Sequence, residues 1–394
     1  MLRKITLTVM IFFVFLSCDK DIKRIVPPQG AVNRVTDFYM FDDNSTFLFL
    51  TSNMNRKYDY GMLVMMKLDP KGNAVYVDSV TLPSLAGKMA VDEKAGFVYV
   101  TSRDLHGIVR VKVSKKQGVS KLSFTDTSSS NYPEVLKTEK EPYAVELSLD
   151  KSKLYTSHLF NGELTVVDLK AWKKIDSFKL KYGVTDFKYY SNLGCFIASH
   201  RSSGFITLAD PVQVLDDLYV EVREIEMDLP TNSYDIRSLG FAADGKSIYA
   251  SFRNVTKDSD DKPAPQLLKL RVKKTGKNKN FIAQVIKSIP LKGSLGELSV
   301  LPYTKGSGDN IYTGELVFVT SPEAKKLYIV DSGNHSVIEE INYSEGCEPY
   351  QVYAKKTGAT KGTVFVSCYV QDKIIYYDVD ISQPYFIREK GVIK

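Results

Sequence analysis

Short runs of alternating apolar and polar residues, separated by turn-forming residues, recur along almost the whole chain. The clearest run is Leu154-Tyr155-Thr156-Ser157, which reads apolar, aromatic, β-branched and small. Such runs are typical of β-strands. Related runs return at intervals of roughly 40 to 70 residues, which predicts a repeated unit built from short strands. Their aromatic residues are Phe49, Tyr99, Tyr155, Phe196, Tyr249, Phe318 and Phe365.

Each run belongs to a larger unit that reads as four strands. Around Tyr155 the pattern predicts strands over residues 143–147, 154–157, 163–168 and 174–179, with polar turns between them. A single four-stranded antiparallel sheet cannot bury both of its faces, whereas seven such sheets stacked radially can. The sequence therefore predicts an all-β fold, a seven-bladed β-propeller of four-stranded antiparallel blades over residues 31–394.

Two stretches resemble the YVTN-type propellers of bacterial envelope and surface proteins. Residues 141–157 (Glu-Pro-Tyr-Ala-Val-Glu-Leu-Ser-Leu-Asp-Lys-Ser-Lys-Leu-Tyr-Thr-Ser) and 162–168 carry the likeness, and Glu348-Pro349-Tyr350 repeats its opening. The pattern extends over roughly residues 31–390, with most units degenerate. The resemblance implies the propeller architecture and a bacterial envelope protein; it implies no particular activity, because one fold hosts many functions.

The N-terminus reads as a targeting segment. Arg3 and Lys4 precede an apolar run, Ile5–Leu16, that is too short to span a bilayer and suits a signal peptide over residues 1–17. Cys18 stands where a bacterial lipobox requires it, which predicts lipidation there and a tether over residues 18–30. A plain signal peptide or a short anchor with an incidental cysteine is the alternative. We expect attachment to the outer or inner membrane through lipid, facing the periplasm or the surface.

The composition is that of a globular protein, with 43% apolar and 25% charged residues. The formal net charge of +7 loses two units with the signal peptide, and no basic run is interleaved with aromatic residues. We therefore expect no nucleic-acid partner. The motifs of haem, zinc and phosphate sites are missing, so we expect no cofactor and no metal. We also expect a monomer.

Strand order predicts which loops share a face of the propeller. The second strand of each blade ends on the face where the first strand begins, so residues just beyond the aromatic runs should gather there with those between blades. The predicted binding residues are Arg103, His158, His200, Arg201 and Arg253, with Tyr143 and Tyr350 as stacking walls. The same face should carry Asn53, Tyr182, Tyr234, Arg237 and Tyr369. Arginines in this arrangement favour a pocket for a carboxylate, a phosphate or an anionic glycan. Alternatively, His158 and His200 simply cap strand edges.

Two functions fit this pattern. The first is a non-enzymatic, lipid-anchored envelope propeller that binds a protein or anionic glycan partner, or serves as a scaffold. The second is a periplasmic lactonase- or cycloisomerase-like enzyme, by analogy with enzymes of similar architecture. Its catalytic set would be His158, Arg201, Arg253 and Glu297, although no linear motif supports that assignment.

The cysteines and the chain ends yield two further predictions. Cys347 precedes the first strand of the last unit and Cys368 ends its second strand, so an antiparallel hairpin would place both thiols at one rim, within disulfide range. Cys195 reads as a buried apolar residue. The ring would close by packing of the first blade on the last, with an outer strand over residues 384–388, or by addition of residues 22–26 as an extra strand.

Overall fold

The computed structural model describes residues 25–116, 119–124, 134–180, 182–190, 195–201, 205–214, 217–226, 234–254, 265–275, 280–306 and 311–394. The expected signal peptide, Cys18 and the tether up to residue 24 lie outside these residues. Within the described ranges, no helix has the length and apolar character needed to cross a bilayer.

The described strands form six four-stranded antiparallel sheets and one five-stranded sheet, each named here by its first strand. Within each four-stranded sheet, consecutive strands are neighbours. The first half of the chain forms β1 (Val35–Met40), β2 (Thr46–Thr51), β3 (Gly61–Leu68), β4 (Ala74–Leu82), β5 (Ala86–Asp92), β6 (Phe97–Ser102), β7 (Gly107–Lys116), β8 (Val119–Phe124), β9 (Val135–Lys137), β10 (Pro142–Leu147), β11 (Lys153–His158), β12 (Glu163–Asp168), β13 (Lys173–Lys179), β14 (Val184–Tyr190), β15 (Cys195–His200), β16 (Phe205–Val214) and β17 (Asp217–Glu226).

The same order continues in the second half. Its strands are β18 (Tyr234–Phe241), β19 (Ser247–Asn254), β20 (Gln266–Thr275), β21 (Asn280–Pro290), β22 (Leu298–Lys305), β23 (Tyr312–Ser321), β24 (Lys326–Asp331), β25 (Ser336–Asn342), β26 (Pro349–Lys356), β27 (Lys361–Cys368), β28 (Lys373–Asp380) and β29 (Ile387–Ile393). The predicted strand at 163–168 matches β12, and that at 174–179 starts one residue inside β13.

The five-stranded sheet departs from the expected pattern at its outer edge. β8 pairs with β7 between Val111 and Lys116, and β9 pairs with the same strand between Gly107 and Val109. Two short strands therefore share the position that one outer strand occupies in the other sheets. The expectation of seven four-stranded blades is corrected to six, together with this divided sheet.

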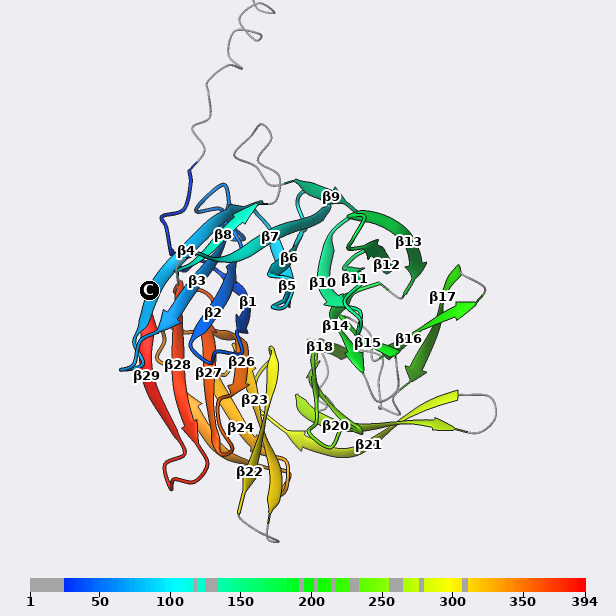
Figure 1. The fold of residues 1–394 in the computed structure, drawn as a ribbon. Helices are drawn as coiled ribbons and strands as arrows, with labels where there is room; N and C mark the ends of the chain where they lie inside the picture. The colour runs from blue at the N-terminus through cyan, green and yellow to red at the C-terminus, as the bar shows by residue number, and fades with distance from the viewer. Residues whose placement is uncertain are drawn as a thin grey trace, which may run out of the picture.

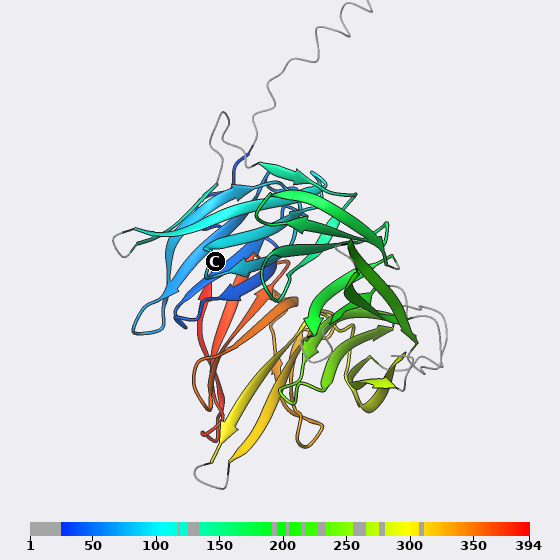
Figure 2. The same ribbon diagram turned by 45° about the vertical axis from the view of Figure 1, so that its right-hand side comes forward.

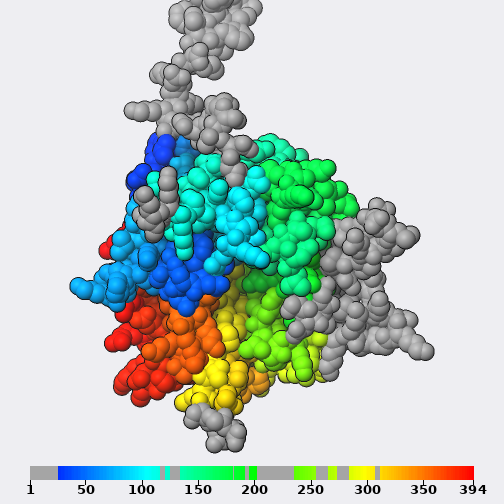
Figure 3. All heavy atoms as spheres, in the orientation of Figure 1, coloured from blue at the N-terminus to red at the C-terminus, as the bar shows by residue number. Residues whose placement is uncertain are grey.

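The sheets follow one another around a central axis in chain order, as Figures 1 and 2 show. The first strands β1, β5, β10, β14, β18, β22 and β26 each contact the next, and β26 contacts β1. Figure 3 shows the same order on the surface, with the sheets as adjoining sectors. The fold is thus an all-β propeller of antiparallel blades, as the sequence predicts.

The repeated aromatic residues lie between neighbouring sheets. All seven are at most 3% exposed, and burying an aromatic or large aliphatic side chain stabilises a fold by roughly 1.5–3 kcal/mol. Phe365 of β27 illustrates the role, because its ring stacks on Phe38 of β1 at 5.8 Å and lies 4.6 Å from the ring of Phe47 in β2. The last sheet and the first are joined by this core.

Within the described residues, ring closure follows the first of the two expected routes, and residues 22–24 of the second route lie outside them. Ile25 and Val26 are exposed and belong to no strand, and the backbone of Ile25 instead bonds to Asp59. The expected outer strand at 384–388 is corrected to β29 (Ile387–Ile393), which pairs with β28 after a turn containing Pro384. Packing of the first sheet on the last, without an added N-terminal strand in the described residues, closes the ring.

Candidate functional site

A register shift marks the start of most of the first strands, on the face where the second strands end. It occurs near the beginning of β1, β5, β10, β14, β18 and β26. A bulge re-aims the side chains that lie within it. The residues within these shifts include Lys88, Tyr143, Arg237, Tyr350 and Gln351. Their side chains carry charged, phenol or amide groups that can bind a ligand.

Arginine and tyrosine side chains gather at this face; we call Arg34, Arg103, Tyr143, Tyr350 and Tyr369 the collar. The rings of Tyr350 and Tyr369 lie 4.9 Å apart, and the Arg34 guanidinium stands 4.7 Å from the centre of the Tyr369 ring. Arg103 lies 5.8 Å from the Tyr143 ring centre and 3.1 Å from Glu141. Cation–π geometry of this kind holds arginine heads over aromatic surfaces.

Burial changes the titration of two collar tyrosines, Tyr143 and Tyr369. It raises the pKa of Tyr369 to about 12, with Tyr350 nearby adding to the effect. Burial also raises the pKa of Tyr143, again assisted by Tyr350 and opposed by Lys88 and Arg103. These phenols therefore stay neutral at physiological pH and present hydroxyl groups beside the guanidinium groups.

A second group of arginines surrounds one buried carboxylate; we call Arg201, Arg237, Arg253 and Asp235 the arginine cluster. Arg237 forms a 2.6 Å ion pair with Asp235, which is 1% exposed. Burial raises the pKa of Asp235, while Arg237, Arg253 and Arg201 act in the opposite direction. Burial lowers the pKa of Arg253, and the neighbouring Arg237 lowers it further.

The cluster and the collar adjoin each other. Tyr350 lies close enough to Arg253 to influence its pKa, so the two groups share one edge. Within the described residues, the guanidinium groups of Arg34, Arg201 and Arg253 form no ion pair with a carboxylate. The face thus carries positive charge that its own carboxylates leave uncompensated, a suitable arrangement for an anion.

The two predicted histidines end β11 and β15 on this face, with their side chains buried. His158 is 0% exposed, and its Nδ1 lies 3.1 Å from the Lys140 carbonyl, while its Nε2 lies 2.9 Å from Thr165 Oγ1. Burial lowers its pKa to about 4, so the ring is neutral; Nδ1 donates to the carbonyl and Nε2 accepts from the hydroxyl. His200 is also buried, with Nδ1 3.1 Å from the Tyr182 carbonyl. These contacts agree with the alternative that His158 and His200 cap strand edges.

The residues of the expected lactonase-like set have different partners. Glu297 forms a 3.1 Å ion pair with Lys88 inside the ring, whereas Arg201 and Arg253 belong to the arginine cluster and His158 is enclosed in its own sheet. Within the described part of the chain, no group of three or more His, Cys, Asp or Glu side chains is placed to hold a metal ion. The acidic run at 258–261 lies outside that part.

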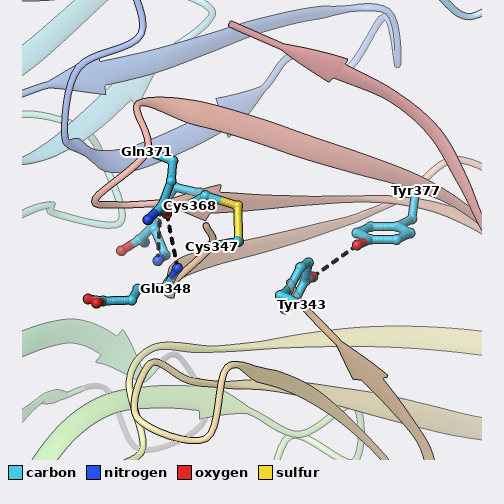
Figure 4. The surroundings of a disulfide bond; sticks show 8 residues. Tyr343, Cys347, Glu348, Cys368, Gln371 and Tyr377 are labelled. Atoms are coloured by element: carbon cyan, nitrogen blue, oxygen red, sulfur yellow. Dashed lines mark hydrogen bonds between the residues drawn. A yellow bond between two sulfur atoms is a disulfide. The ribbon is translucent and has the colours of Figure 1, made fainter. Parts of the chain in front are cut away.

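Cys347 and Cys368, predicted as a pair, form a disulfide with their Cα atoms 4.8 Å apart, drawn in Figure 4. The bond joins the segment before β26 to the end of β27, beside Tyr350 and Tyr369 of the collar. The backbone amide of Glu348 donates to Gln371 Oε1, and that of Tyr369 donates to the Glu348 carbonyl. Cys195 is buried, as the sequence predicts.

Sequence reasoning missed several residues of this region. Arg34 precedes β1 outside the repeat, and Asp235 sits at a strand start with no distinguishing motif. Lys88 and Gln351 belong to register shifts that apolar and polar alternation does not reveal. The available signal was the clustering of Arg201, Arg237 and Arg253 around successive strand ends, which the strand-order argument did capture.

No family model matches the chain, and no curated protein matches it. Solved structures resemble it in fold. A hydrazine synthase structure from Kuenenia stuttgartiensis is 12% identical, covers 91% of this chain and 97% of its own, and has a TM-score of 0.59. Virginiamycin B lyase from Staphylococcus aureus is 12% identical, with coverage of 90% and 96% and a TM-score of 0.53. A streptogramin B lyase is 12% identical, covers 88% of this chain and 94% of its own, and has a TM-score of 0.54. At these identities the likeness shows the β-propeller fold alone.

Proposed function

We propose that this chain is a non-enzymatic binding propeller of the bacterial cell envelope, whose collar and arginine cluster bind an anionic partner, either a protein or a glycan. The observation that carries the proposal is the set of three guanidinium groups, Arg34, Arg201 and Arg253, without carboxylate partners in the described residues, beside stacked tyrosines. Guanidinium groups bind carboxylates, sulfates and phosphates in bidentate geometry. Tyrosine rings add flat surfaces that suit sugar rings.

The enzymatic alternative receives less support. The only histidine offered for its catalytic set, His158, has both ring nitrogens engaged and a pKa of about 4. A general base must reach its substrate and titrate near the working pH. At 12% identity, the likeness to virginiamycin B lyase shows the fold alone and supports no activity for this chain.

Heparin is a suitable first probe of an anionic glycan. Titration calorimetry with the mature protein should give saturable binding that weakens as salt rises, because ion pairs are screened. Removing two of the three unpaired guanidinium groups, with Arg201→Ala and Arg253→Ala, should weaken binding at least tenfold, about 1.4 kcal/mol. Arg388→Ala, on the exposed outer strand β29, is the matched control and should bind like the parent.

Two results would count against this function. One is equal binding by the double variant and the parent, which would place any heparin site elsewhere. The other is turnover of sugar lactones that Arg253→Ala abolishes, which would favour the enzyme. An acidic protein recovered from envelope extract by the parent and lost with the double variant would support the protein form of the partner.

The proposal includes the lipid anchor at Cys18. The lipobox-like position of Cys18 supports it, and two or more acyl chains make membrane attachment stable. Cys18→Ala should release the protein from the membrane fraction. Retention of that variant after a high-salt wash would show that another attachment dominates.

We also propose to count the five-stranded sheet as a seventh blade of a YVTN-type ring. Pairing of both β8 and β9 with one edge of β7 supports this count, because the sheet then has four strand positions. Contacts of β5 with both β1 and β10 place it in the ring like the other sheets.

A further inference from the structure

The first strands line a cavity of about 320 Å³ inside the ring, separate from the collar. Lys88 of β5 reaches Glu297 at 3.1 Å and Gln351 Oε1 at 3.5 Å. Glu297 precedes β22, and the β5 and β22 sheets are not neighbours, so this ion pair spans the interior of the ring. From there the cavity extends to Val91 and Leu147, near the far ends of β5 and β10.

Most charged side chains in the cavity form hydrogen bonds or ion pairs that join one first strand to another. Asp37 accepts hydrogen bonds from the amides of Phe38 at 3.0 Å and Met89 at 2.9 Å. The bond to Met89 links β1 to β5. These carboxylate oxygens are occupied by backbone donors, so Asp37 has a structural role.

Asp186 repeats this arrangement in another sheet. It accepts from the amides of Phe187 at 3.0 Å and Leu239 at 2.9 Å, linking β14 to β18. Lys188 stands 3.5 Å from Asp186 and donates to the Leu239 carbonyl at 2.7 Å. The cavity's second lysine is therefore occupied as well.

Glu146 of β10 is the exception. It lines the cavity and is partly exposed to it, yet its carboxyl group has neither a hydrogen bond nor an ion pair with any described residue. Lys188 favours its ionised form, and Asp186 and Asp37 disfavour it. Burial outweighs Lys188 and raises the pKa of Glu146 to about 8. An unpaired carboxyl group in such surroundings is stabilised when a cation arrives.

Aromatic and small residues line the same cavity. Tyr39 of β1 and Tyr353 of β26 line it, together with Ala90 and Ser299. The Tyr39 hydroxyl donates to Glu93 at 2.7 Å, and the Tyr353 hydroxyl accepts from the Met40 amide at 3.3 Å, so both rings are held in place. Tyrosine faces and a carboxylate are the groups that proteins use to hold organic ammonium ions.

We propose that this cavity binds a small organic ammonium compound, with its cationic group against Glu146 and its alkyl groups against Tyr39 and Tyr353. This site goes beyond the anion-binding function proposed above, because it lies deeper in the ring and takes ligands of opposite charge. A cavity of about 320 Å³ falls within the size range of small-molecule sites. No collar residue lines the cavity, although Lys88 and Glu297 in its lining lie near Tyr143, so variants of Glu146 and variants of Arg201 and Arg253 test the two sites separately.

Choline is the probe for the test, since its charge does not change with pH. Calorimetric titration should show choline affinity rising up to tenfold per pH unit below about pH 8 and levelling above it, because Glu146 must ionise to pair with the cation. Glu146→Gln should lower affinity at pH 8.5 at least tenfold and remove the pH dependence. An amide resembles the protonated carboxyl group, so the variant should keep the parent's circular dichroism and melting temperature.

Two controls make the result decisive. Glu345→Gln, an exposed loop residue with no ion pair in the described chain, should leave choline binding unchanged. The neutral choline isostere 3,3-dimethylbutanol should bind at least tenfold more weakly than choline. Equal binding of the two compounds, equal binding by Glu146→Gln, or no saturable choline binding at any pH would each overturn the proposal, whatever the outcome with heparin.

Discussion

In the β10 sheet and in the β26 sheet, the segment before the first strand is joined to the end of the second strand, by a hydrogen bond in one and a disulfide in the other. In both, the first strand begins with a proline that pairs with the last residue of the second strand: Pro142 with His158, and Pro349 with Cys368. His158 then bonds to the carbonyl of Lys140, two residues before the proline. Cys368 bonds covalently to Cys347, also two residues before the proline. We call this connection the strand-end link.

The β14 sheet provides a third case. Val184 pairs with His200, and His200 lies 3.1 Å from the carbonyl of Tyr182, again two residues before the first strand. The geometry of the link is thus shared while its chemistry varies. In the β10 and β26 sheets the linked segment leads directly into a collar residue, Tyr143 or Tyr350. The link therefore stabilises the segments that position the binding face.

Removing the covalent link should have the largest effect. Replacing Cys347 and Cys368 together by Ser should lower the free energy of unfolding by about 3 kcal/mol, since the bond closes a loop with a sequence separation of 21 residues. Denaturant unfolding of parent and variant measures the loss. Cys195→Ser, which changes a buried cysteine outside this disulfide, should cost less. A double variant as stable as the parent would show that the disulfide adds nothing to the fold.

Breaking the hydrogen-bonded link should cost somewhat less. His158→Leu leaves the Lys140 carbonyl and the Thr165 hydroxyl without their partner, a loss of about 2 kcal/mol at pH 7 for buried polar groups. His335→Asn is the control, because Asn tolerates the positive φ of 52° at that position and should change stability by less than about 0.5 kcal/mol. A His158→Leu variant of parental stability would contradict the role assigned to the ring.

The sequence predicted the strands and the place of the strand-end link. It predicted the disulfide in the β26 sheet but not the histidine hydrogen bonds in the β10 and β14 sheets. Cys347 and Cys368 could be paired because antiparallel register places a strand start against a strand end. The same register argument placed His158 and His200 at the binding face. Both lie at strand ends there with buried side chains, because alternation does not tell which way a strand-end side chain turns. The Lys88–Glu297 pair joins sheets that are not neighbours, so only the closed ring could reveal it.

Acid should weaken the histidine link and spare the disulfide. His158 has a pKa of about 4 in the fold, against 6.5 ordinarily, so between those values the unfolded chain binds more protons. The histidine contribution is complete above pH 6.5 and falls as pH drops toward 4, by at most about 1.4 kcal/mol per pH unit. The stability advantage of the parent over His158→Leu should shrink in this range. A difference that stays constant from pH 7.5 to 4 would contradict the assigned pKa.

Exchanging one chemistry for the other should produce the smallest change. Cysteines at positions 140 and 158, introduced by Lys140→Cys and His158→Cys, should form a disulfide because these positions correspond to Cys347 and Cys368. Closing this loop should add about 3 kcal/mol, and losing the two histidine hydrogen bonds should cost about 2 kcal/mol. The net gain over the parent should be about 1 kcal/mol, and the gain over a Lys140→Ser, His158→Ser reference should be about 3 kcal/mol.

Thiol quantification shows whether the disulfide forms, and denaturant unfolding under non-reducing conditions measures both stability differences. If positions 140 and 158 remained free thiols under oxidising conditions, the β10 and β26 sheets would not share the geometry of the strand-end link.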